Sequence, residues 1–157
     1  MIRPARMEDR DAMLAAIVAS GLFDDDGIAT IAPMLDAFLG GTAGPGDTWL
    51  AVERDGKVCG AAFYQPEPLT DGTWNLQLIA VRTDAHRSGI GRALLRYVEA
   101  DLSAHGGRIL LIETSGLAAF EGTRRFYRAC DYNDEARIRD FYATGEDKIV
   151  FLKRLVR

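Results

Sequence analysis

The stretch from Trp74 to His105, WNLQLIAVRTDAHRSGIGRALLRYVEADLSAH, constrains the fold more than any other part of the chain. Its first residues, up to Arg82, place apolar side chains at alternate positions, which predicts a strand. From Ile90 onward, apolar residues recur at helical spacing, which predicts a long amphipathic helix. Gly89 and Gly91 lie in the turn between the two. A strand, a glycine turn and a helix start aim backbone N–H groups at one point, so this stretch predicts an anion site.

Predicted strands and helices alternate on both sides of this stretch. In chain order they are an edge strand at Ile2–Ala5, helices at Met7–Ser20 and Ile28–Leu39, a hairpin of Thr48–Arg54 and Lys57–Gln65, the central strand and helix, a buried strand at Arg108–Glu113, a helix at Glu121–Ala129, and closing strands at Tyr132–Phe141 and Lys148–Leu155. This order predicts an α/β (α+β) fold with a mixed central sheet of about six or seven strands and helices on both faces. The 157 residues show no linker or repeat, so we expect a single domain over residues 1–157.

Composition excludes several classes of protein. The net charge is −4, whereas a nucleic-acid binder usually has a basic surplus, so no nucleic acid is expected as a partner. No apolar run approaches the length of a membrane span, and the N-terminus lacks the apolar core of a signal peptide. Cys59 and Cys130 are isolated, which favours a reducing cytoplasm. His86 and His105 are too few for a zinc site, so we expect no metal.

The glycine turn by itself has two interpretations. It can be an anion cradle, or only a tight turn where a helix packs closely on a strand. The phosphate-loop pattern G-x-x-x-x-G-K-[ST] is absent, and G-x-G-x-x-G lacks its third glycine. The common nucleotide-binding motifs are therefore excluded.

A longer pattern is more specific. LQLIAVRTDAHRSGIGRALLRYVE resembles the acyl-CoA-binding motif of the GNAT superfamily of N-acetyltransferases, Q/R-x-x-G-x-G/A after the fourth strand. FYRACDY, from Phe126 to Tyr132, resembles the second signature of that family, and the element order matches from Ile2 to Leu155. The resemblance implies the GNAT fold and an enzyme that transfers an acetyl group from acetyl-CoA to a primary amine by direct attack in a ternary complex.

The resemblance also implies the residues that bind acetyl-CoA. Backbone N–H groups around Gly89 would cradle the pyrophosphate, and the edge of the central strand would pair with the pantetheine arm, with the N–H of Ile79 polarising the thioester carbonyl. The full set is Ile79, Ala80, Val81, His86, Arg87, Ser88, Gly89, Ile90, Gly91 and Arg92. Arg87 and Arg92 are equally consistent with solvated surface arginines.

Three positions depart from the family pattern. His86 occupies the Q/R position, and Phe120 stands where an Asn is common before the signature tyrosine. Asp131 replaces a glycine after the tyrosine helix, and Asp also tolerates a left-handed backbone.

The expected reaction needs a proton acceptor for the amine and a proton donor for the leaving thiolate. Tyr127 matches the family's signature tyrosine and is the candidate donor, although it could instead be a core aromatic. Asn75 and Gln77 stand where some members carry a base, but amides cannot act as bases, so we assign them to substrate positioning. Glu113 is the candidate base, with a pKa raised by partial burial; the alternative is an exposed or ion-paired glutamate at a strand end.

The tail, EARIRDFYATGEDKIVFLKRL, and the pair Glu113 and Tyr127 resemble the bacterial enzymes that acetylate the N-terminal alanine of a ribosomal protein. Phe141 and Tyr142 could help to bind a peptide N-terminus, or could be a packing pair in a hairpin. Asp24, Asp25, Asp26 and Asp71 could form a negative rim, but a solvated acidic loop with Asp26 as a helix cap is the plainer interpretation.

Three functions remain open at this point. The first is acetylation of a small amine, an amino acid or a peptide; the second is protein N-terminal acetylation; the third is a catalytically silent domain that binds or senses acyl-CoA. In this family an edge strand such as the last one, Lys148–Leu155, often pairs across a dimer, so a homodimer is a further expectation.

Overall fold

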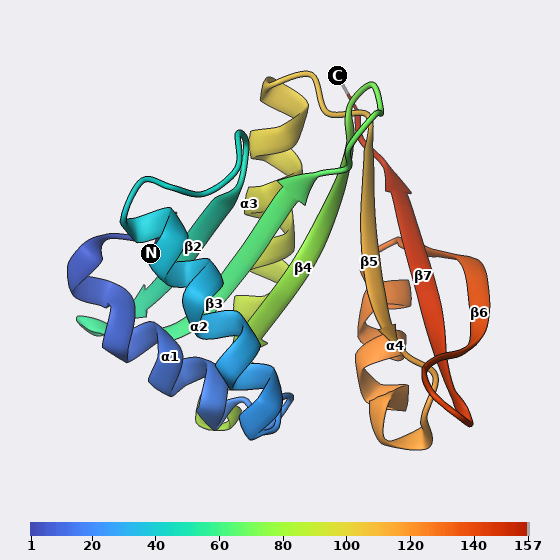
Figure 1. Ribbon diagram of the computed structural model, residues 1–157, viewed down its shortest axis with the longest axis horizontal. Coiled ribbons are helices and arrows are strands. Elements are labelled where there is room, and N and C mark those ends of the chain that lie inside the picture. Colours follow the sequence, from blue (N-terminus) through green and yellow to red (C-terminus); the bar gives the residue numbers. More distant parts are fainter. Residues whose placement is uncertain (157) are drawn as a thin grey trace. The chain divides into compact units, whose positions relative to one another are not determined.

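The computed structural model describes residues 1–156, whose backbone contacts group into two compact units (Figure 1). The first unit contains Met1–Gln65 and Gln77–Val98. The second contains Pro66–Leu76 and the residues from Glu99 onward.

Strands and helices follow the predicted order. They are β1 (Ile2–Pro4), α1 (Arg10–Ala19), α2 (Asp25–Leu39), β2 (Thr48–Arg54), β3 (Lys57–Pro66), β4 (Thr73–Val81), α3 (Ile90–Ala104), β5 (Ile109–Ser115), α4 (Glu121–Ala129), β6 (Asn133–Ala143) and β7 (Glu146–Arg154). Over residues 1–156 the strands form one seven-stranded sheet in the order β1-β2-β3-β4-β5-β7-β6. β4 and β5 pair in parallel, whereas β1–β2, β2–β3, β5–β7 and β6–β7 are antiparallel. The prediction of a mixed sheet of about six or seven strands is therefore confirmed.

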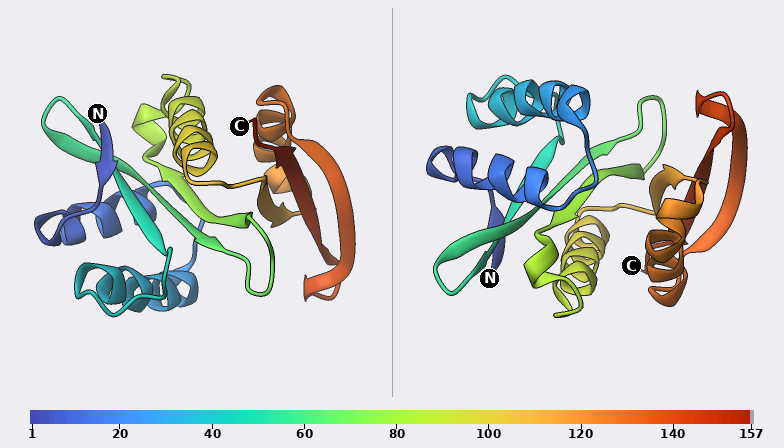
Figure 2. Two further views of the ribbon diagram at one scale, coloured as in Figure 1. Left: turned by 90° about the horizontal axis from the view of Figure 1, so that it is seen from above. Right: turned by 90° about the horizontal axis from the view of Figure 1, so that it is seen from below.

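The first unit is built on the β2–β3 hairpin. Its turn residues, Asp55 and Gly56, have positive φ angles of 52° and 74°, the backbone that a two-residue hairpin turn requires. In this unit α1 and α2 cover one face of the strands and α3 begins on the other (Figures 1 and 2). Helices on both faces were predicted from the order of the elements.

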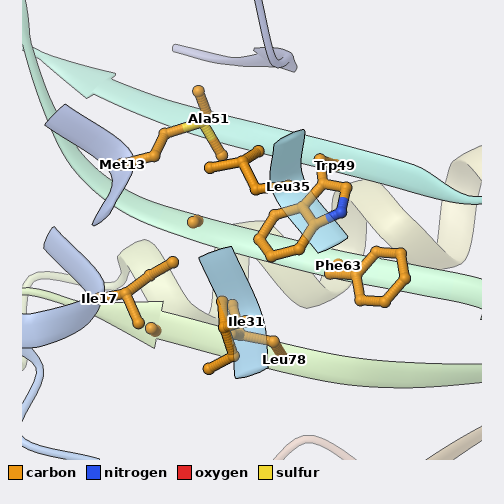
Figure 3. Close-up of a cluster of buried hydrophobic side chains, with 10 residues drawn as sticks. Met13, Ile17, Ile31, Leu35, Trp49, Ala51, Phe63 and Leu78 are labelled. Atoms are coloured by element: carbon orange, nitrogen blue, oxygen red, sulfur yellow. The ribbon is translucent and has the colours of Figure 1, made fainter. Parts of the chain in front are cut away.

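Figure 3 shows the core between the first two helices and the strands. Met13 and Ile17 from α1 and Leu35 from α2 are fully buried. They pack on a layer that includes Trp49 of β2, whose ring stacks on Phe63 of β3 at 4.7 Å between centroids. These apolar contacts hold the two helices on the sheet.

The second unit combines β5, β7 and β6 with α4. The Tyr127 ring of α4 lies 5.5 Å from the Phe151 ring of β7 and 6.2 Å from that of Tyr132. The helix ends at a left-handed residue, Asp131, with φ 68°. The sequence predicted that an aspartate could replace glycine at this cap.

The structure corrects four details of the predicted elements. Asp25 and Asp26 lie in the first turn of α2 and not in a loop. The Asp24 side chain accepts a hydrogen bond from the Gly27 N–H and caps α2, so the cap assigned to Asp26 belongs to Asp24. The first helix starts at Arg10 after a 3-10 turn. Glu113 lies inside β5, which continues to Ser115, rather than at its end.

The last correction concerns the edge strand. The final strand, β7, lies between β5 and β6, so the edge of the sheet is β6. A hairpin predicted from sequence can be placed either way round, and only the pairing of Ile109–Ser115 with Lys148–Arg154 decides it. The helices described within residues 1–156 are too short or too polar to cross a membrane.

Candidate active site

The glycine turn of the first unit is held in shape by its own side chains. The His86 Nε2 atom lies 2.7 Å from the carbonyl oxygen of Val81, the last residue of β4. The Ser88 hydroxyl donates a hydrogen bond to the Ala85 carbonyl. Arg87 and Gly89 both have left-handed backbones, with φ angles of 60° and 81°. Left-handed residues at alternate positions turn successive N–H groups toward one side, the arrangement called a nest.

Helix α3 adds its own N-terminus to this turn. The helix begins at Ile90, and the Ala93 N–H donates to the Gly89 carbonyl at 3.0 Å. N–H groups before that bond have no acceptor within the helix, and the helix dipole makes them attractive to negative charge. A Cβ built on Gly89 would meet no atom within 4 Å. The turn therefore has the donors and the open space that a diphosphate needs.

The strand residues expected to bind the cofactor lie beyond the parallel ladder of β4. That ladder joins Thr73–Leu76 to Ile109–Ile112. Ile79 is half-buried, whereas Ala80 and Val81 are buried. Because His86 approaches the Val81 carbonyl, this carbonyl already has a hydrogen-bond partner.

In the second unit a polar cluster surrounds Asn75. The Asn75 side chain is 2% exposed, and its Nδ2 atom donates to Glu67 Oε1 at 2.9 Å and to Glu113 Oε1 at 3.2 Å. The Lys148 Nζ atom lies 2.9 Å from Glu113 Oε2. Asn75 Oδ1 is buried without a hydrogen-bond partner. Glu113 is thus held at both oxygens, beside an acceptor atom that has no donor.

Aromatic side chains of β6 lie over this cluster. The Lys148 Nζ atom lies 3.8 Å from the centre of the Phe141 ring, a cation–π contact. Phe141 packs edge-on against Tyr142, with 5.1 Å between ring centroids. Burial, together with the negative charges of Glu113 and Glu146, raises the pKa of Tyr142. Phe141 and Tyr142 therefore pack against each other and also lie beside the acidic cluster.

Tyr127 has a different environment. It is 4% exposed and lies among the rings of Phe126, Tyr132 and Phe151. Burial, with a smaller contribution from Cys130, raises the pKa of Tyr127 far above its usual value. The phenol therefore stays protonated, as a proton donor must before it acts.

Glu113 and Tyr127 approach the sheet of this unit from opposite faces. Glu113 is paired with Val150 in the register of β5 and β7, whereas Tyr127 packs on Phe151, the next residue of β7. Neighbouring residues of a strand point to opposite faces. The structure therefore brings Glu113 together with Asn75 but not with Tyr127. The other amide candidate, Gln77, is exposed on β4.

Sequence reasoning missed Glu67 and Lys148. Glu67 stands between two prolines in the β3–β4 connection, where its N–H donates to the Thr73 carbonyl at 2.8 Å. Lys148 is paired with Ser115 across β5 and β7, which places it diagonally beside Glu113. The signal for Lys148 was a charged residue at the start of an apolar strand. Only the register connects it to Glu113.

No group of three or more His, Cys, Asp or Glu side chains within the described part of the chain is arranged to hold a metal ion. Each unit instead presents one candidate surface: the anion cradle around Gly89, and the Glu67–Asn75–Glu113–Lys148 cluster.

Comparison with known families gives one match: the model of the acetyltransferase (GNAT) domain matches residues 45–134. Comparison with curated protein sequences gives no match. Among solved structures, a protein from Desulfovibrio desulfuricans that is assigned to the GNAT family of acetyltransferases is 32% identical, with 99% of each chain covered and a TM-score of 0.94.

Two further structures share the fold. The ribosomal-protein-S18-alanine N-acetyltransferase of Escherichia coli is 22% identical, with 100% of this chain and 94% of that one covered and a TM-score of 0.76. An aminoglycoside 6′-N-acetyltransferase complexed with coenzyme A is 14% identical, with 100% and 98% covered and a TM-score of 0.78. These similarities are spread over the chain and are not confined to either unit.

Proposed function

The chain belongs to the GNAT family of acetyl-CoA-dependent N-acetyltransferases, and from that premise we propose that it acetylates the primary amine of a small molecule, an amino acid or a peptide. The observation that carries the proposal is the anchored carboxylate of Glu113, held by Asn75 and Lys148. Such a carboxylate can take the proton that an ammonium group must lose before it attacks.

Binding of acetyl-CoA is proposed for the first unit. The N–H groups at the start of α3 and the left-handed turn of Arg87 and Gly89 would receive the pyrophosphate, with His86, Ser88, Ile90, Gly91 and Arg92 completing the turn. Ile79, Ala80 and Val81 would supply the strand backbone. Acetyl-CoA supplies the acetyl group as a thioester.

Proton transfers are proposed for the second unit. Glu113 accepts a proton from the acceptor ammonium, which leaves the nitrogen lone pair free to form the new C–N bond. Tyr127 donates its phenolic proton to the sulfur as the C–S bond breaks. The second proton of the attacking nitrogen is lost to solvent, from which the Tyr127 phenolate regains a proton. Asn75, Gln77 and Tyr142 are proposed to position the acceptor.

Further properties belong to the same proposal. Residues 1–157 would act as one acetyltransferase domain, which is supported by a family match that runs from the first unit into the second. Cys59 and Cys130 are buried and are not joined by a disulfide, which supports a cytoplasmic location. The exposed edge strand β6 supports a homodimer. No nucleic acid or membrane is proposed as a partner.

Release of free thiol from acetyl-CoA across a panel of amines tests the proposal. We expect Glu113→Gln to lower kcat/KM by about 100-fold at neutral pH and by less at high pH, where free amine is plentiful. Tyr127→Phe should lower kcat by a similar factor at all pH values below the tyrosine's raised pKa, with KM for acetyl-CoA unchanged. A loss in Glu113→Gln that does not depend on pH would remove Glu113 as the base.

The same panel separates the alternative functions. Protein N-terminal acetylation is favoured by the likeness to the S18-alanine enzyme and by the aromatic pair Phe141 and Tyr142, each about half exposed. It predicts kcat/KM at least tenfold higher for peptides than for small amines. A silent acyl-CoA sensor predicts binding without thiol release for any amine, and no effect of Tyr127→Phe.

A further inference from the structure

One amide group brings two carboxylates together in the second unit. Asn75 Nδ2 donates to Glu67 at 2.9 Å and to Glu113 at 3.2 Å. Two carboxylates that share one neighbourhood oppose each other's ionisation, so that one of them tends to keep a proton. Asn75 alone does not remove this conflict, because an amide carries no net charge.

Lys148 supplies the opposing charge. Its Nζ atom lies 2.9 Å from Glu113 Oε2, the oxygen that Asn75 does not contact. Lys148 is 8% exposed, and the Phe141 ring covers its ammonium group at 3.8 Å. A buried ammonium is stable only with a negative partner, so this position of Lys148 depends on an ionised Glu113.

Other titratable groups around Glu113 come from β6 and β7. Tyr142 of β6 is a neutral phenol, because burial and the negative charges of Glu113 and Glu146 raise its pKa. Glu146 of β7 accepts a hydrogen bond from Ser115 Oγ at 3.1 Å and adds negative charge. Lys148 is thus the cation among several acidic groups.

We propose that Lys148 is a positioning residue that keeps Glu113 ionised and oriented against the charge of Glu67. This inference rests on the proposed role of Glu113 as the base. Without Lys148, the negative charge of Glu67 would disfavour the ionised form of Glu113. The fraction of Glu113 able to take a proton from the acceptor amine would then fall.

Titration of Glu113 tests the coupling directly. The ¹³C signal of its carboxyl group, assigned by its loss in Glu113→Gln, is followed against pH in the protein without acetyl-CoA. In Lys148→Met we expect the midpoint to rise by about one pH unit, and in Lys148→Arg to stay near that of the wild type. An unchanged midpoint in Lys148→Met would overturn the proposal.

Glu67→Gln provides the decisive second variant. In the Glu67→Gln/Lys148→Met double variant the midpoint should return to within about 0.3 units of the wild type, because both opposing charges are gone. Glu67→Gln by itself should lower the midpoint. If Lys148→Met does not fold, Glu67→Gln still tests the inference. An unchanged Glu113 midpoint in Glu67→Gln would overturn it.

Lys153 is the matched control. It lies on the same strand and pairs with another glutamate, Glu99, at 3.1 Å. Lys153→Met should leave the Glu113 midpoint where it is. A shift of similar size in this variant would mean that any change in β7 disturbs Glu113, and would overturn a specific role for Lys148.

Activity measured on the same variants separates the inference from the proposed function. Relative to the wild type with one acceptor, Lys148→Met should lose up to about tenfold in kcat/KM at pH values below the Glu113 midpoint and less than about twofold at pH 9. KM for acetyl-CoA should not change. A midpoint that moves while kcat/KM does not would support the coupling of Lys148 to Glu113 and would overturn Glu113 as the base.

Discussion

Gly89 has a left-handed backbone and open space at its Cβ position, and a larger residue would be strained in this backbone and would fill this space. Its φ angle is 81°, and the space where a Cβ would stand is open. A β-branched residue in this conformation costs about 1–3 kcal/mol and would fill the space in front of the N–H groups.

We therefore expect Gly89→Val to weaken acetyl-CoA binding at least tenfold, measured by isothermal titration calorimetry. Gly122→Val is the matched control: Gly122 also has open space around its Cβ position, but it lies in α4 without a positive φ. Equal affinity of Gly89→Val and the wild type would contradict the cradle.

The contacts of the Asp9 carboxylate contribute to stability in a way that depends on pH. Its carboxylate accepts hydrogen bonds from Arg3 at 2.6 and 2.9 Å and from the Arg6 N–H at 2.8 Å. These contacts hold the pKa of Asp9 below the ordinary value of 3.8. The pKa of Asp9 is lower in the folded protein than in the unfolded chain. The stabilisation is therefore complete at pH values above the unfolded pKa, and it is lost as the pH falls through the folded pKa.

Asp9→Asn should lower the free energy of unfolding by about 3 kcal/mol at pH 7 in urea titrations, because Arg3 loses a buried partner. The difference from the wild type should shrink below pH 3.8. Glu53→Gln is the comparison: this half-buried glutamate accepts one bond from Arg3 at 3.1 Å, and its loss should cost less than about 1 kcal/mol. If Asp9→Asn and Glu53→Gln lower the free energy of unfolding by equal amounts, Asp9 is not the main partner of Arg3.

At the scale of elements, Arg124 fixes the connection between β5 and α4. Its Nη1 atom donates to the Ser115 carbonyl at 2.6 Å and to the Leu117 carbonyl at 2.9 Å. Its Nη2 atom pairs with Glu121 at 2.8 Å. The side chain is 9% exposed, so these hydrogen bonds are largely shielded from water. The start of the helix that carries Tyr127 is therefore set by one arginine.

Arg124→Ala should destabilise the protein by about 2–3 kcal/mol, because the Ser115 and Leu117 carbonyls both lose a buried guanidinium donor, although the Leu117 carbonyl keeps a bond from the Phe120 N–H. The neighbouring Arg125 is 77% exposed, and Arg125→Ala should change stability by less than about 0.5 kcal/mol. Chemical denaturation of both variants measures the difference. Similar stabilities would mean that the backbone alone holds the connection.

Irregular backbone in the β6–β7 hairpin places an aromatic side chain over the acidic cluster. The register of the two strands shifts between Ile138 and Ala143, and Asp140 within this segment has a φ angle of 54°. The Asp140 N–H donates to Asp147 at 3.0 Å, and Asp140 accepts a bond from the Gly145 N–H at 2.7 Å. These bonds hold the segment that carries Phe141 and Tyr142.

At the scale of the whole molecule, binding of acetyl-CoA should stabilise the fold by mass action. At a ligand concentration about 100 times Kd the gain is about 2.7 kcal/mol, which for a chain of this size raises Tm by about 5–10 °C. Differential scanning fluorimetry measures the shift, with ATP as the control phosphate ligand. A shift with ATP and none with acetyl-CoA would contradict the proposed binding site.

Local pattern predicted most of the elements of this chain. The Asp55-Gly56 turn, the apolar repeat after Ile90 and the left-handed Asp131 each depend on neighbouring residues, so they follow from sequence. Boundaries were less accurate where a side-chain cap, and not the apolar repeat, decided them. The Asp24 cap, for example, starts α2 three residues before the first apolar residue of its pattern, Ile28.

The sequence by itself determined the family, the glycine turn and the identity of Tyr127 and Glu113 as candidates, because each belongs to a short pattern along the chain. Only the tertiary structure decided what surrounds Glu113. Glu67, Asn75 and Lys148 come from the β3–β4 connection, β4 and β7, and strand register brings them together. Register depends on pairing between distant segments, so the charge that faces a carboxylate across a sheet cannot be read along one strand.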